Sequence, residues 1–214
     1  LSERGGRVIP DTGRPNAARR ILQGMLLLAA GRREGLACFE SSTDAFGAAL
    51  APQLAFLLVE GIQLFLQPGK VVAGVKLLLS FCVMLLPAVV SQFYASRWGR
   101  SALWLRYITA ATWCNWVVLL VSLFCTLLAS LLFPALVSQP GFMGAIVFAA
   151  AVYEMWLQWF VARAGLAVTG GRAALLYVTV LLASLLLYGT AALLPPHYVV
   201  LGDILQPMIA LKNT

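Results

Sequence analysis

Long uncharged apolar runs alternate with short polar segments over most of the chain. Five of these runs are long enough to cross about 30 Å of hydrocarbon as a helix. They cover residues 46–66, 71–94, 107–133, 142–161 and 173–194. Segments rich in Gly and Pro separate the runs, and Pro87 predicts a kink in the second. The pattern therefore predicts an all-α membrane protein, with five transmembrane helices in residues 45–195.

The region before the first run has a different pattern. Residues 1–16 have no apolar period and predict a disordered tail. In residues 17–44 the uncharged stretch 21–31 is too short to span a bilayer. It predicts an amphipathic helix and linker on the cytoplasmic membrane surface, where four arginines would bind anionic lipid. These are Arg19, Arg20, Arg32 and Arg33. The alternative is a helix packed against the protein's own cytosolic loops.

Composition agrees with a membrane protein. Of the 214 residues 61% are apolar and 11% are charged, which is unlike a soluble domain. The net charge of +7 comes mainly from twelve Arg that flank the apolar runs. This placement is typical of anchoring at a membrane surface and does not favour nucleic-acid binding.

The basic residues also predict the orientation. With five spans every Arg falls on one side of the membrane, whereas Lys70, Lys76 and Lys212 fall on the other. The positive-inside rule then places the N-terminus in the cytoplasm and the C-terminus in the periplasm of a bacterial inner membrane. Residues 196–214, with the single histidine His197, would form a short extracytoplasmic tail.

The third and fourth spans carry polar and aromatic residues that match in depth. Reflection about the turn near Pro134 pairs Asn115 with Glu154. The predicted buried polar layer comprises Trp113, Asn115, Trp116, Tyr153, Glu154 and Gln158. A carboxylate at this depth is costly unless it is hydrogen-bonded, protonated or in contact with water. The pattern favours a structural clamp between two helices, and the alternative is a proton or substrate site at Glu154.

Two further features concern helix contacts. Glu60 and Lys76 lie at equal distances from Pro68, which predicts an ion pair near the outer membrane surface; the alternative is that both extend separately to the headgroups. Small residues recur every fourth position on two spans and predict close helix packing. The two stripes are Gly47, Ala51 and Ala55, and Gly141, Ala145 and Ala149.

Motifs for catalysis or cofactor binding were not found in the sequence. It contains no GxSxG, HExxH, Walker A or GxGxxG pattern, and Cys38, Cys82, Cys114 and Cys125 have no metal-binding spacing. We therefore expect no cofactor, no metal and no enzymatic activity.

The layout resembles the Yip-type membrane domain. The resemblance is carried by residues 26–36, by Phe46, and by the segments 104–107 (WLRY) and 113–116 (WCNW). The resemblance covers most of residues 17–194, and these segments resemble those of uncharacterised bacterial proteins of alphaproteobacterial type. The resemblance implies a five-span fold and an association with membrane organisation or trafficking, and it transfers no catalytic residues.

Three functions are consistent with these observations. The first is a non-enzymatic assembly or membrane-organisation factor, which acts through helix contacts with a protein partner or a second copy. The second is a small transporter or channel subunit that uses the layer around Glu154. The third is an accessory subunit of a membrane enzyme complex. A transporter predicts a water-accessible cavity at Glu154, whereas a scaffold predicts a dry layer and an exposed stripe of small residues.

Overall fold

The computed structural model describes residues 17–66, 70–137 and 140–193, and this part of the chain contains helices and no strands. The expected tails 1–16 and 196–214, including His197, lie outside the described residues. The helices are α1 (Ala17–Ala29), the 3₁₀ helix η1 (Arg33–Cys38), α2 (Thr43–Phe65), α3 (Lys70–Arg97), α4 (Ser101–Leu132), α5 (Pro134–Val137), α6 (Pro140–Gly165) and α7 (Gly170–Leu193).

Five of these helices, α2, α3, α4, α6 and α7, are long and apolar enough to cross a membrane. The predicted fold class is thus confirmed, with a short helix before the first span. The largest difference in bounds is at α4, which begins at Ser101 and not near residue 107. The charge of Arg106 does not end the helix, because a long side chain can reach the headgroups from a continuing helix.

Glycines end two helices at one end of the molecule. Gly31 and Gly99 adopt φ of 73° and 66°, in the left-handed region that costs glycine little. After α3, the Arg100 amide donates to the carbonyl of Ala95 at 2.7 Å, as in a Schellman motif. The chain can therefore reverse tightly between α3 and α4, which keeps Arg97 and Arg100 together at this end.

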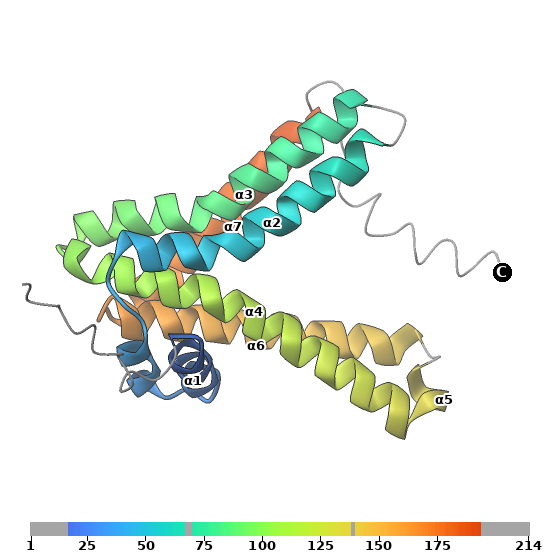
Figure 1. Cartoon of the computed structure of the whole chain (residues 1–214), viewed down its shortest axis with the longest axis horizontal. Coiled ribbons are helices and arrows are strands. Elements are labelled where there is room, and N and C mark those ends of the chain that lie inside the picture. Colours follow the sequence, from blue (N-terminus) through green and yellow to red (C-terminus); the bar gives the residue numbers. More distant parts are fainter. Residues whose placement is uncertain (1–16, 67–69, 138–139, 194–214) are drawn as a thin grey trace, which may run out of the picture.

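The spanning helices form two arms (Figure 1). One arm contains α2, α3 and α7, and the other contains α4 and α6, which pack along each other. Pro52 lies inside α2 and Pro87 inside α3, and both helices change direction along their length in Figure 1. Because a proline removes a backbone hydrogen bond and bends a helix, these two residues account for the bends of α2 and α3.

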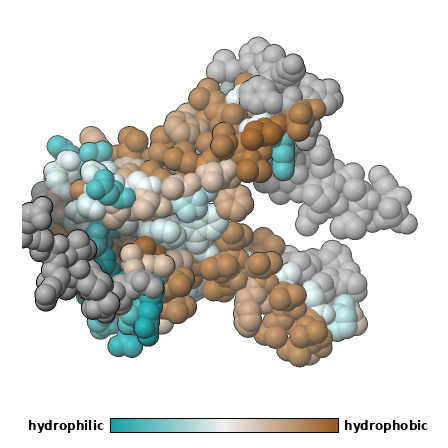
Figure 2. All heavy atoms as spheres, in the orientation of Figure 1, coloured by the Kyte–Doolittle hydropathy of each residue, from teal (hydrophilic) through white to brown (hydrophobic). Residues whose placement is uncertain are grey.

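The arms meet at the end that carries the arginines, called here the arginine end. Figure 2 shows hydrophilic residues gathered there, and apolar surface along both arms. The described arginines of this end are Arg19, Arg20, Arg32, Arg33, Arg97, Arg100, Arg106, Arg163 and Arg172. The opposite ends of the arms, called the open end, are separated by a wide gap in the same view.

Helix α1 closes the arginine end from one side. It is seen end-on in Figure 1, whereas the long helices run in the plane of the picture, so α1 lies across them. Its Met25 and Leu28 are buried in the core together with residues of α4 and α6. Leu22 and Leu26 remain exposed. The helix therefore packs against η1 and two spanning helices, and keeps a second apolar face of the kind that a membrane surface binds. Its place on the cytoplasmic membrane surface stays a prediction.

Candidate functional site

A cavity of about 240 Å³ lies where the two arms separate, and all five spanning helices line it. We call it the central cavity. Its polar lining side chains are Gln53, Tyr107, Thr112, Asn115, Glu154, Gln158 and Tyr177. The buried core of the arginine end lies next to it, because Tyr107, Ile108 and Thr112 belong to both. The cavity is therefore closed toward the arginine end by packed side chains.

Asn115 and Gln158 join the two helices of the second arm. The Gln158 amide nitrogen donates a hydrogen bond to the Asn115 side-chain oxygen. The expected partner of Asn115 was Glu154, so the true register differs by one helical turn. The close approach of Gly165 to Tyr107 gives the same register. Reflection about Pro134 fails because the connection between α4 and α6 is not symmetric: it contains the separate helix α5.

The carboxylate of Glu154 lies beside this amide pair and faces open space. Glu154 is exposed, as is Asn115, and both line the central cavity and a second groove between α4 and α6. Among the described residues the Glu154 carboxylate has no ion-pair partner. The expectation of a buried layer is wrong at these two residues, because the arms separate at this depth.

The groove between α4 and α6 also contains Ser122 and Thr126. Their hydroxyls donate to the carbonyls of Val118 and Ser122, respectively, both at 2.8 Å. Such bonds satisfy the hydroxyl within its own helix. These two residues therefore contribute little to binding, and Glu154 with Asn115 remains the polar centre of the groove.

A larger cavity of about 730 Å³ continues from the central cavity toward the open end. We call it the open cavity. Gln53, Met84, Pro87 and Asn115 line both cavities, so the two adjoin each other. Glu60, Gln63, Ser80 and Tyr188 add polar groups along the walls of the open cavity. Polar side chains are therefore present in both cavities, from Glu60 to Glu154.

Trp116 and Tyr153 have other roles than the expected polar layer. Trp116 lines the open cavity, its ring centroid lies 5.4 Å from that of Phe56, and its indole N–H is buried without a hydrogen-bond partner in the described chain. The Tyr153 hydroxyl donates to the Ala29 carbonyl at 3.0 Å and so holds α1 against α6. Trp113 packs against the core of the arginine end.

The ion pair of Glu60 with Lys76 stays a prediction. Glu60 lines the open cavity, whereas Lys76 is half-buried on α3 and lines neither cavity. The ion pairs seen between described residues lie at the arginine end, where Arg20 pairs with Glu40 and Arg32 with Glu34.

Gln53 and Tyr177 are cavity residues that the sequence pattern did not single out. Gln53 lies on α2 and Tyr177 on α7, each with apolar residues on both sides in the sequence. Isolated polar residues in spanning segments are a signal of function or packing. That signal was present in the sequence, but only the tertiary fold shows that both residues line the central cavity with Glu154.

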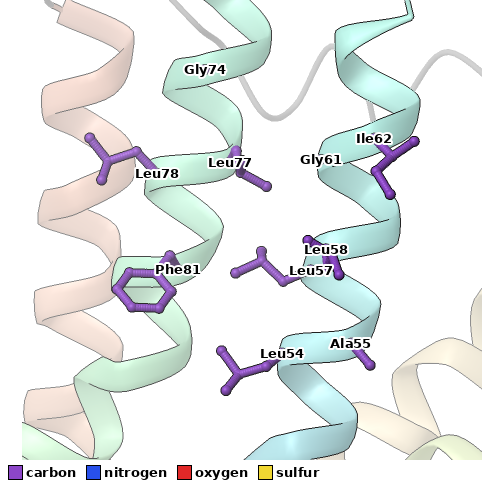
Figure 3. A pocket seen from close by; sticks show the side chains of 10 residues that line it. All are labelled: Leu54, Ala55, Leu57, Leu58, Gly61, Ile62, Gly74, Leu77, Leu78 and Phe81. Atoms are coloured by element: carbon purple, nitrogen blue, oxygen red, sulfur yellow. The ribbon is translucent and has the colours of Figure 1, made fainter.

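An apolar groove of about 720 Å³ lies between α2 and α3 (Figure 3). Leu54 and Leu57 point from α2 toward α3, and Leu77 points back. The groove contains no polar side chain among the residues that line it. It offers no chemistry for binding a polar ligand and forms part of the hydrocarbon-facing surface.

Comparisons of the chain with protein-family models, with curated proteins and with solved structures gave no match.

Proposed function

We propose that this multi-pass membrane protein is a small transporter or channel subunit, whose binding site is the central cavity around Glu154. The observation that carries the proposal is the exposure of Glu154 to two connected spaces between the helices. A structural clamp would hold Glu154 in a packed, dry layer. Charged groups inside a membrane instead persist where they face a water-filled cavity, and such residues mark substrate or ion pathways.

The lining of the open cavity supports water access. Its walls carry the carboxylate of Glu60, the amides of Gln53 and Gln63 in addition to that of Asn115, and the hydroxyls of Ser80 and Tyr188. We propose that water reaches Glu154 from the open end while the core of the arginine end blocks passage to the other side.

Charge distribution supports an orientation. Because cytoplasmic segments are enriched in arginine and lysine, we propose that the arginine end lies in the cytoplasm of a bacterial inner membrane. The cavities would then open to the periplasm. Phosphatase fusions or cysteine labelling should place Arg97, Arg163 and Arg172 in the cytoplasm and Lys212 outside, and a cytoplasmic C-terminus would contradict the five-span topology.

Single-cysteine variants test water access to the cavity. In a protein without its four native cysteines, Glu154→Cys should react with a membrane-impermeant thiol reagent, because thiolates form in water and not in hydrocarbon. The control is Val152→Cys, two residues earlier on α6 and 44% exposed on a surface that lines none of the described cavities. Equal resistance of both variants would show a dry layer and remove the proposal.

A second candidate function is a membrane assembly factor, as the Yip-type resemblance implies. It is favoured by exposure of both small-residue stripes: Gly47, Ala51, Ala55, Gly141, Ala145 and Ala149 are all exposed. Small residues allow spanning helices of different molecules to approach closely. Ala51→Leu and Ala145→Leu should weaken a dimer seen by light scattering in detergent, and a monomeric unsubstituted protein would exclude self-assembly through these stripes.

A further inference from the structure

The central and open cavities, which adjoin each other, carry negative charge without a compensating cation among their described lining residues. Glu154 lines the central cavity and Glu60 lines the open cavity. The remaining polar groups in both are amides, hydroxyls and an indole. No Arg or Lys of the described chain lines either space.

Four of the described arginines make contacts elsewhere, at the arginine end. Arg20 and Arg32 pair with Glu40 and Glu34 at the arginine end. The guanidinium of Arg163 lies 5.4 Å from the ring centroid of Trp159, and that of Arg172 lies 5.8 Å from that of Trp98. These contacts keep four guanidinium groups at the closed end, whereas Glu154 is the one charged side chain among the described residues that line the central cavity.

The chemistry of the walls narrows the kind of cation. The described residues contain no group of three or more His, Cys, Asp or Glu that could hold a metal ion. The central cavity, with its single carboxylate, is also lined by the aromatic residues Phe46 and Tyr177 and by apolar side chains such as Leu50 and Leu181. A cavity with one carboxylate, aromatic rings and apolar walls suits an ammonium group on an organic body, through ion pairing and cation–π contact.

We infer that the central cavity binds a monovalent organic cation, an ammonium with apolar substituents, with Glu154 as its counter-charge. Asn115 and Gln158 hold each other and fix the wall next to that carboxylate. Glu60 adds a second carboxylate on the wall of the adjoining open cavity. The inference rests on the proposed function, because it requires that the cavity is filled with water and open to solutes.

Charged thiol reagents test the inference on the full chain in proteoliposomes. The reporter is Met84→Cys, since Met84 lines both cavities, and Ser80→Cys in the open cavity is a second reporter should the first fail to fold. All four native cysteines are replaced by alanine. The reagents are methanethiosulfonates that carry either a trimethylammonium or a sulfonate group. For each reporter, the reaction rate with the cationic reagent is divided by the rate with the anionic reagent. This ratio is then divided by the same ratio for free cysteine in solution.

We expect the cationic reagent to react about tenfold faster than the anionic one, as a partly screened unit charge near the thiol would cause. Glu154→Gln should lower this preference severalfold. Glu34→Gln, a carboxylate change at the arginine end, should leave it unchanged. Excess tetraethylammonium should slow labelling of the reporter by a neutral methyl reagent, and Glu154→Gln should abolish that protection.

The outcomes separate the inference from the function on which it rests. If neither charged reagent reacts at either reporter, the cavity is not open to water, and the proposed function falls with the inference. Reaction without a charge preference overturns the cation site alone. Protection by calcium in place of tetraethylammonium overturns the organic class of the cation.

Discussion

The arginine end and the open end of this protein are built from the same five spanning helices, yet they differ in nearly every physical property. At the arginine end, buried residues of α1, α4, α6 and α7 form one core, and indoles donate hydrogen bonds across helices: Trp104 to Ser91 at 3.0 Å and Trp159 to the Gly170 carbonyl at 2.9 Å. At the open end, leucines such as Leu131 and Leu186 are exposed. Polar cavity walls lie between these two regions.

The difference shows how a small membrane protein can combine a rigid part with an accessible site. Packing, and not hydrophobicity, holds helices together in lipid, so the tightly packed end supplies the stability. The separated arms need no mutual packing, since lipid or water can cover them. This division leaves Glu154 at the boundary, supported by α4 and α6 and still exposed.

The largest expected effect contrasts two leucines. Leu157→Ala, at a side chain that is 0% exposed in the core, should lower the free energy of unfolding by about 2 to 5 kcal/mol, because it leaves a cavity. Leu186→Ala, at a side chain that is 70% exposed, should change it by less than about 0.5 kcal/mol. Denaturation of both variants in detergent would measure this, and equal losses would mean that the open end is packed as tightly as the arginine end.

The second contrast is between a glycine at the contact of α1 with η1 and a glycine that faces open space. A Cβ at Gly24 would lie 2.7 Å from Phe39 Cε2 and 2.8 Å from the Cys38 Cβ, so Gly24→Ala should cost about 1 to 3 kcal/mol and loosen α1 from η1. Gly47→Ala places its methyl group in open space and should be neutral or slightly stabilising in the helix. Trypsin cleavage at Arg19 and Arg20 should accelerate only in the first variant.

The contact between Tyr153 and Ala29 should have a smaller effect. Tyr153→Phe removes the hydrogen bond to the end of α1 and should cost about 1 kcal/mol, the net contribution of one such bond. Tyr188→Phe, in the open cavity, is the matched change and should have less effect on thermal unfolding. A larger loss at Tyr188 would show that the open end contributes unrecognised stability.

The smallest expected effect concerns the open end itself. Glu60→Lys alone should destabilise the protein in detergent, and the addition of Lys76→Glu should restore much of the loss if the two side chains meet. Contacting residues typically give a coupling energy above about 0.5 kcal/mol in a double-mutant cycle. Strictly additive effects would mean that the pair does not form and that the charge of Glu60 belongs to the cavity alone.

Much of the fold could be predicted from the sequence, because each apolar run is long enough to span a bilayer by itself. Backbone hydrogen bonds in a membrane must be made within the segment, which leaves helix as the solution for 46–66 or 173–194 whatever surrounds them. The grouping of arginine at one end followed from the same count of spans. The amphipathic helix α1 could also be predicted from local sequence, since its apolar patch lies between charged flanks.

Tertiary structure decided which polar residues meet. Asn115 pairs with Gln158 and not with Glu154, because the register of α4 on α6 depends on their packing and on the shape of the connection at α5. Pro52 and Pro87 mark where α2 and α3 bend, but their direction of bend, which opens the cavity beside Glu154, depends on neighbouring helices. A carboxylate on an apolar helix looks the same in sequence whether its surroundings are dry or open, since its environment is made by residues distant along the chain.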